Sequence, residues 1–171
     1  MFKYFENRRN RKEKARELYA QAEAQGRLPE FYDSLGVPDS VDGRFEMIAL
    51  HCYILMHRLQ AKGDKKLSQA LFDVFFKQMD LSLREMGVGD LGVPKHMKRM
   101  MQGFNGRATH YETAVKTNNR EELKKALIQD VYGTVENPNN NNAEQLADYV
   151  LSNLNLENGF TTVEKTEQKV A

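Results

Sequence analysis

The residues most suggestive of chemistry are three glycines in the run GVGDLG, from Gly87 to Gly92. This run matches the G-x-G-x-x-G fingerprint of dinucleotide-binding proteins, in which glycines let the backbone approach a pyrophosphate. The fingerprint works only where a β-strand enters the turn and a helix follows it. Here apolar residues precede the turn at helical spacing, namely Phe72, Phe75, Phe76, Met79, Leu83 and Met86. We therefore expect the glycines to end one helix and turn the chain into the next, without nucleotide chemistry.

Histidine and cysteine side chains do not form a recognisable catalytic or metal-binding pattern. The chain has four histidines, which are His51, His57, His96 and His110. No two of them have the i, i+3 or i, i+4 spacing of a helical metal pair, so we expect them to be structural or exposed. Cys52 is the only cysteine, which excludes an intrachain disulfide, and its apolar helical neighbours predict a place in the core. We predict no catalytic residue, no metal and no cofactor, and hence no enzymatic activity.

The segment after the glycines is basic and rich in methionine. Between Leu91 and Tyr111 there are four Lys or Arg residues and no acidic residue. The predicted partner-binding surface consists of Lys95, Lys98, Arg99, Arg107, Met97, Met101 and Phe104. Basic side chains suit a phosphate-bearing or acidic partner, and thioethers make adaptable apolar contacts. Two alternatives stay open, because the methionine spacing also fits a core stripe and the basic side chains also fit a solvated face.

Composition limits the classes of partner. The chain has 171 residues, of which 25 are basic and 24 acidic, so its net charge of +1 implies no general attraction to nucleic acid or anionic lipid. Any such attraction has to come from local patches. The length fits one globular domain. No apolar run approaches the roughly 18 to 20 residues that span a bilayer as a helix. We therefore expect a cytoplasmic protein, soluble or peripheral at the inner membrane.

The first 27 residues form a predicted basic helical arm, with eight Lys or Arg and four Glu. Phe2, Tyr4 and Phe5 lie at its very start. One interpretation is an arm that binds a membrane surface or a partner. The other is a solvated helix that leans on the core through a sparse apolar stripe, namely Ala15, Leu18, Tyr19 and Ala22. The segment has no signal-peptide apolar core, and its glutamates are unusual for a transit peptide.

The spacing of apolar residues predicts an all-α fold, a compact single-domain bundle of about six to seven helices. After the arm at 1–27, a helical domain is expected over 28–156, followed by a flexible tail over 157–171. The expected helices of the domain cover about 28–37, 45–59, 67–86, 94–115, 120–131 and 146–154. No alternation typical of a β-strand reaches a useful length.

The central residues resemble the signature of the ubiquinol–cytochrome c chaperone family. The resemblance is in LREMGVGDL from Leu83 to Leu91, in VPK from Val93, in Met97-Lys98 and in FNGR from Phe104. It extends from about Phe31 to Leu127 and includes DGRF at Asp42. One position departs from the pattern, since Asn105 stands where an aromatic residue is expected before Gly-Arg.

This resemblance implies an all-α, non-enzymatic assembly chaperone for respiratory complex III. It implies that the partner is nascent or partly assembled cytochrome b, with the ribosome as a possible second partner. The absence of a transit peptide makes the chain look more like a bacterial relative than a mitochondrial one. The alternative function is a general ribosome- or RNA-associated protein that uses the basic helix. The sequence leaves the oligomeric state open.

Overall fold

A computed structural model describes residues 1–163 of the chain and contains seven α-helices, with no strand over that range. The helices are α1 (Phe2–Gly26), α2 (Pro29–Asp33), α3 (Val41–Ala61), α4 (Lys65–Glu85), α5 (Val93–Lys116), α6 (Arg120–Asp130) and α7 (Asn140–Asn153). The predicted all-α class is confirmed, and the helix number agrees with the expected six to seven.

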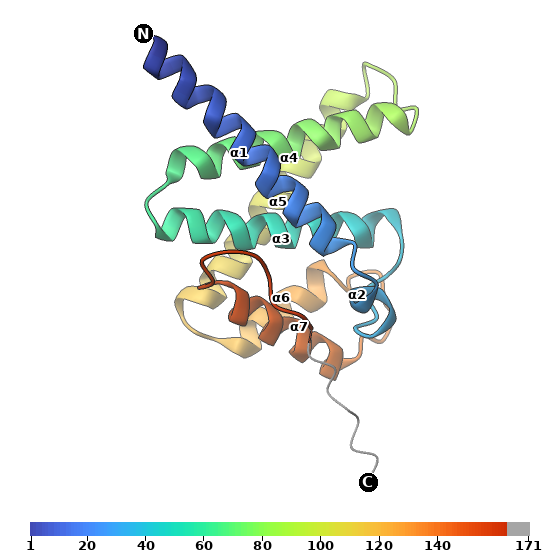
Figure 1. Cartoon of the computed structure of the whole chain (residues 1–171). Coiled ribbons are helices and arrows are strands. Elements are labelled where there is room, and N and C mark those ends of the chain that lie inside the picture. Colours follow the sequence, from blue (N-terminus) through green and yellow to red (C-terminus); the bar gives the residue numbers. More distant parts are fainter. Residues whose placement is uncertain (164–171) are drawn as a thin grey trace.

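Helix α3 lies at the centre of the fold (Figure 1). On one side α1 crosses both α3 and α4, and on the other side lie α6 and α7. Ile48, Cys52 and Leu55 of α3 face a core cluster shared with α1 and α4. Met47 and Leu50 face a second cluster, shared with α2, α5, α6 and α7. Because α3 separates two cores, it is apolar on nearly every face.

The second half of α1 belongs to this packed body. Ala15 and Ala22 are fully buried and Tyr19 is nearly so, which confirms the interpretation of a sparse core-facing stripe. The first ten residues are all exposed and project away from the other helices (Figure 1). The helical arm therefore has a free first half and an anchored second half.

The start of α3 shows why a glycine occurs in the DGRF segment. The hydroxyl of Ser40 accepts a hydrogen bond from the Gly43 amide at 3.1 Å and caps the helix. A Cβ atom at position 43 would lie 1.8 Å from the carbonyl oxygen of Pro38, so any side chain there would push the loop away. Glycine thus permits the close contact of the loop with the first turn of α3.

The glycine run between α4 and α5 is a joint between two helices, as predicted. Helix α4 enters it, and Gly87 has a φ of +85°, which L-residues with a side chain rarely adopt. Pro94 lies in the first turn of α5, where its missing amide hydrogen removes no helical bond. Since no strand precedes the glycines, the structure confirms that this run is not a dinucleotide loop.

The segment after α7 packs against the body, which differs from the flexible tail predicted to begin at 157. The guanidinium of Arg58 donates to the carbonyl oxygens of Asn153 at 2.7 Å and of Gly159 at 2.8 Å. The amide of Thr161 donates to the Asn153 side chain at 2.9 Å, and Phe160 packs against both core clusters. The Arg58 bonds join residues 95 and 101 positions apart, so local periodicity cannot reveal them. The remainder of the predicted tail, 164–171, lies outside the described residues.

No helix among the described residues combines the length and the apolar character needed to traverse a lipid bilayer.

Candidate functional site

The first turns of α5 present an exposed basic patch. Lys95, Lys98 and Arg99 are all exposed, and their spacing of three and four residues places them on one helical face. Within residues 1–163 none of the three takes part in an ion pair. The first turn of α5 also has no acidic residue, so the positive end of the helix dipole is not neutralised there. We call these three residues the α5 basic patch.

The predicted apolar residues lie at different depths. Met101 is 39% exposed and borders the α5 basic patch, whereas Met97 is half-buried against the core shared with α1, α3 and α4. Phe104 is only 4% exposed. Its ring packs against three phenylalanines of α4, which are Phe72, Phe75 and Phe76. Phe104 therefore serves the core and offers a partner almost no surface, while Met101 does offer one.

Arg107 does not join the α5 basic patch, because its guanidinium turns toward the interior. It donates to the carboxylate of Glu46 on α3 and lies over the ring of Phe45, 5.9 Å from the centroid. Glu46 is 7% exposed. Burial raises the pKa of Glu46 and the Arg107 cation opposes that rise. Arg107 thus fixes α5 to α3, although its residue type suggested a surface contact.

Gly103 makes room for this interaction. A Cβ atom at position 103 would lie 2.6 Å from a terminal nitrogen of Arg107, so the guanidinium occupies the space that a side chain would take. At Gly106, by contrast, an added Cβ would meet nothing within 4 Å. The two glycines of α5 therefore differ in role.

A groove of about 840 Å³ runs beside the second half of α5, between α3 and α4. The half-buried Phe72 contributes apolar surface to it, while Phe104 and Met56 lie buried beneath its floor. Its polar lining includes Gln69 and Asn105. A groove with apolar and polar walls of this kind can accept a polypeptide segment.

Three polar residues in one wall of the groove form a hydrogen-bonded cluster. One oxygen of Glu112 accepts from the Tyr53 hydroxyl at 2.9 Å and from Nδ1 of His57 at 3.0 Å. Partial burial acts to raise the pKa of Glu112, but these hydrogen bonds together with the nearby charges of His57 and Lys116 hold the pKa below its usual value. Sequence reasoning missed this cluster because Glu112 is 55 and 59 residues from its two donors along the chain. No local spacing signals it.

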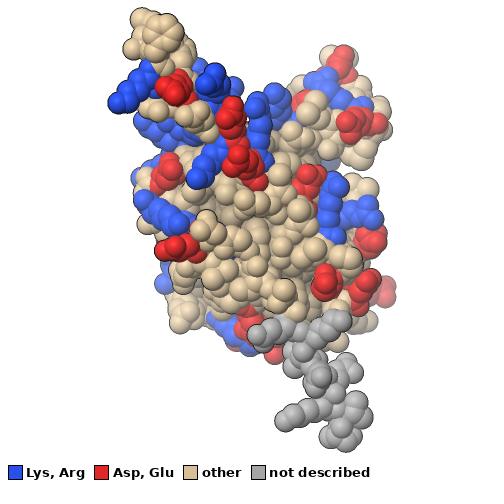
Figure 2. Space-filling model, viewed as in Figure 1, with Lys and Arg blue, Asp and Glu red and all other residues tan. Residues whose placement is uncertain are grey.

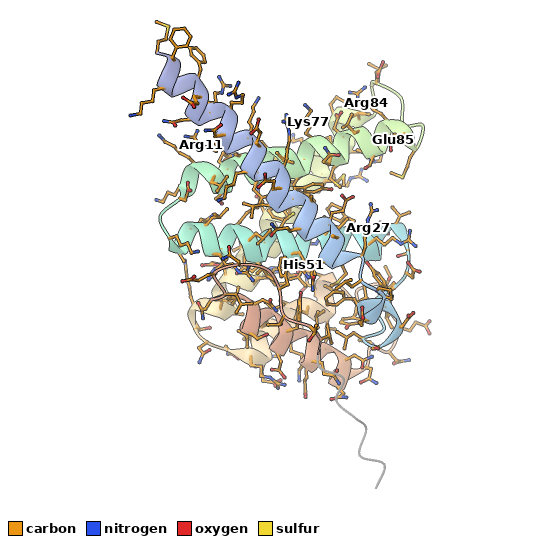
Figure 3. All side chains as sticks on the ribbon, viewed as in Figure 1. Arg11, Arg27, His51, Lys77, Arg84 and Glu85 are labelled. Carbon is orange, nitrogen blue, oxygen red and sulfur yellow. The ribbon has the colours of Figure 1, made fainter. Side chains whose placement is uncertain are left out.

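The histidine at position 51 has a structural role. His51 is fully buried, on the side of α3 that faces α7 (Figure 3). Its Nδ1–H donates to the Met47 carbonyl at 2.6 Å, so Nε2 accepts from the Tyr149 hydroxyl at 2.9 Å. Burial lowers the pKa of His51 to about 4, which keeps the ring neutral at pH 7. Among residues 1–163, no cluster of three His, Cys, Asp or Glu residues could hold a metal ion.

Comparison with known proteins relates this arrangement to a chaperone family. The family described as "Ubiquinol-cytochrome C chaperone" matches residues 33–157. The crystal structure of a Cbp3 homolog from Brucella abortus is similar over 96% of this chain and 98% of its own, with 30% identity and a TM-score of 0.81. No curated protein matches the chain. Because the family match covers most of the sequence and the solved structure matches nearly all of it, this chain belongs to the ubiquinol–cytochrome c chaperone family.

Proposed function

We propose that this protein is a non-enzymatic assembly chaperone that binds newly made or partly assembled cytochrome b while complex III forms. The observation that supports this most strongly is family membership over residues 33–157. The near full-length likeness to the Cbp3 homolog adds support. The engagement of Cys52, His51 and Glu112 in packing and hydrogen bonds is in keeping with a binding role.

The α5 basic patch is the proposed contact with the acidic or phosphate-bearing part of the partner. Lys95, Lys98 and Arg99 project from a helix whose other face is fixed in the core by Phe104 and Arg107. A rigid helix loses little entropy when it presents three cations to a partner. Met101, at the edge of the patch, supplies an apolar contact that adapts to different side chains.

The groove beside the second half of α5 is the proposed site for a polypeptide segment of the client. Its apolar wall, which includes the half-buried Phe72, would cover apolar side chains that a membrane protein exposes before assembly. The polar lining would meet the backbone of such a segment. The same helix thus offers a groove for the client chain and, one to three turns earlier, cations for its charged regions.

Deletion of the gene tests the function itself. We expect the amount of assembled complex III to fall, and complementation with the intact gene to restore it. The readout is the amount of the complex in membranes, measured on native gels. Normal complex III in the deletion strain would exclude the proposed function.

Charge reversal tests the patch. We expect Lys98→Glu/Arg99→Glu to capture cytochrome b at least about tenfold less well in detergent extracts, because two cationic contacts become repulsive. The matched control is Arg8→Glu/Lys12→Glu, which changes the net charge equally on a different helix. Equal capture by both variants, at low and high salt, would exclude the patch. Salt-sensitive binding to unrelated RNA without preference for cytochrome b would favour the ribosome- or RNA-associated alternative.

A further inference from the structure

The largest exposed apolar side chains gather at two projecting ends of the molecule. One end is the start of α1, where Phe2 is 94% and Phe5 57% exposed. The other is the joint between α4 and α5, where Leu91 is 98% and Met86 58% exposed. Both ends project on the same side of the helical body (Figure 1). Exposed apolar residues normally occur singly on a protein surface, so a group of them marks an interaction surface.

A basic groove of about 750 Å³ lies next to the first of these ends, between α1 and α4. Its lining contains six cations and one carboxylate, Asp73. The cations are Arg8, Arg11, Lys12, Arg16, Lys66 and Lys77. None of them forms an ion pair with another residue in the described range 1–163. We call this feature the α1–α4 basic groove.

The groove and the two ends form one edge of the molecule. Arg11 on α1 and Lys77 on α4 lie along this edge, and Arg84 lies near the second end (Figure 3). The space-filling view shows both basic and acidic side chains on the two projections, with uncharged atoms at the tip of α1 (Figure 2). Ala15, Tyr19 and Ala22 anchor the second half of α1 in the core, and the first half continues the same helix past the groove to the tip.

We propose that this edge docks onto the surface of an anionic phospholipid bilayer. The cations of the α1–α4 basic groove face lipid phosphates, while Phe2, Phe5 and Leu91 enter the boundary between headgroups and acyl chains. The apolar ends decide between a bilayer and a nucleic acid. A polyanion such as RNA would engage the cations and stack bases on Phe2 and Phe5, but it would leave the aliphatic Leu91 in water, whereas a bilayer removes all three side chains from it.

This proposal goes beyond the binding of a client. The α5 basic patch and the groove beside α5 involve different residues, so membrane docking and client capture can be measured separately. Docking at a bilayer would place a chaperone where an apolar client is inserted, but the docking test below needs no client.

Co-flotation of the full chain with lipid vesicles tests the proposal. One set of vesicles contains equal parts phosphatidylglycerol and phosphatidylcholine, and the other contains phosphatidylcholine only. We expect binding to the anionic vesicles to be at least about tenfold tighter and to weaken with salt. Phe2→Ser/Phe5→Ser and Arg8→Glu/Lys12→Glu should each reduce it by about tenfold or more, the first through lost insertion and the second through charge.

Two matched variants serve as controls. Val41→Ser removes an apolar side chain that is 67% exposed elsewhere, and Lys116→Glu/Lys125→Glu reverses two exposed charges at the end of α5 and on α6. Both should float as the wild type does, and circular dichroism should show every variant folded. Equal binding to both vesicle types, or none, would overturn the proposal. If Phe2→Ser/Phe5→Ser binds as tightly as the wild type, the edge is a polyanion surface and the bilayer is excluded.

Discussion

The two halves of α5 use their charges in opposite ways. In the first half, Lys95, Lys98 and Arg99 are exposed and have no ion-pair partner within residues 1–163. In the second half, Arg107 pairs with Glu46, and Glu112 accepts hydrogen bonds from two residues of α3. The first half is therefore available to a partner, while the second half holds the helix in place. A window without acidic residues does not predict which basic residues stay free, because their partners come from other helices.

Removing Arg107 should have the largest effect on stability. Arg107→Met leaves the buried Glu46 carboxylate without the one hydrogen-bond partner that it has within residues 1–163, and we expect the free energy of unfolding to fall by about 3 kcal/mol. Urea denaturation measures it. The matched control, Lys98→Met, should change stability by less than about 0.5 kcal/mol. Replacing both Glu46 and Arg107 with methionine should recover most of the loss. Equal effects of Arg107→Met and Lys98→Met would contradict the contrast between the two halves.

Acidification should lower the stability of the folded chain through the buried His51, which an exposed histidine would not do. Its pKa is about 4 in the folded chain and about 6.5 when unfolded, so the unfolded state binds more protons as the pH falls below 6.5. Stability is therefore unaffected above pH 6.5 and is lost as the pH falls toward 4. From pH 7 to pH 5 we expect His51 to contribute a loss of about 2 kcal/mol.

The measurement compares urea denaturation of the wild type and His51→Gln at both pH values. Because glutamine does not titrate, the difference in stability between the two proteins should change by that amount. A difference that stays constant with pH would show that protonation of His51 does not oppose folding.

The glycines of α5 should show the smallest effect. Gly106→Ala adds a methyl group in open space and raises helix propensity, so we expect a gain of up to about 1 kcal/mol. Gly103→Ala has the same intrinsic benefit but displaces the Arg107 guanidinium, so we expect it to gain clearly less. Thermal unfolding of both variants measures this difference. If the two substitutions stabilise equally, the fit of Arg107 over Gly103 does not matter to the fold.

Local sequence patterns predicted most of the helices because each one buries a periodic apolar face. The cap at Ser40, the first-turn position of Pro94 and the core position of Cys52 follow from such local rules. The candidate site was less predictable. The type and spacing of Lys95, Lys98 and Arg99 predicted an exposed face, but nothing local distinguished them from Arg107. Similarly, helical spacing could not show that Phe104 is buried while Met101 is exposed.

The sequence by itself determined the all-α class, the glycine joint without nucleotide chemistry, and a family resemblance that the comparisons confirmed. Only the tertiary structure decided which charges are paired and which segments pack against the body. The Glu112 cluster, the Arg58 bonds to residues after α7 and the α1–α4 basic groove all join residues far apart in the chain. The physical reason is that a helix repeats every 3.6 residues, so its local pattern specifies a face but not what covers that face.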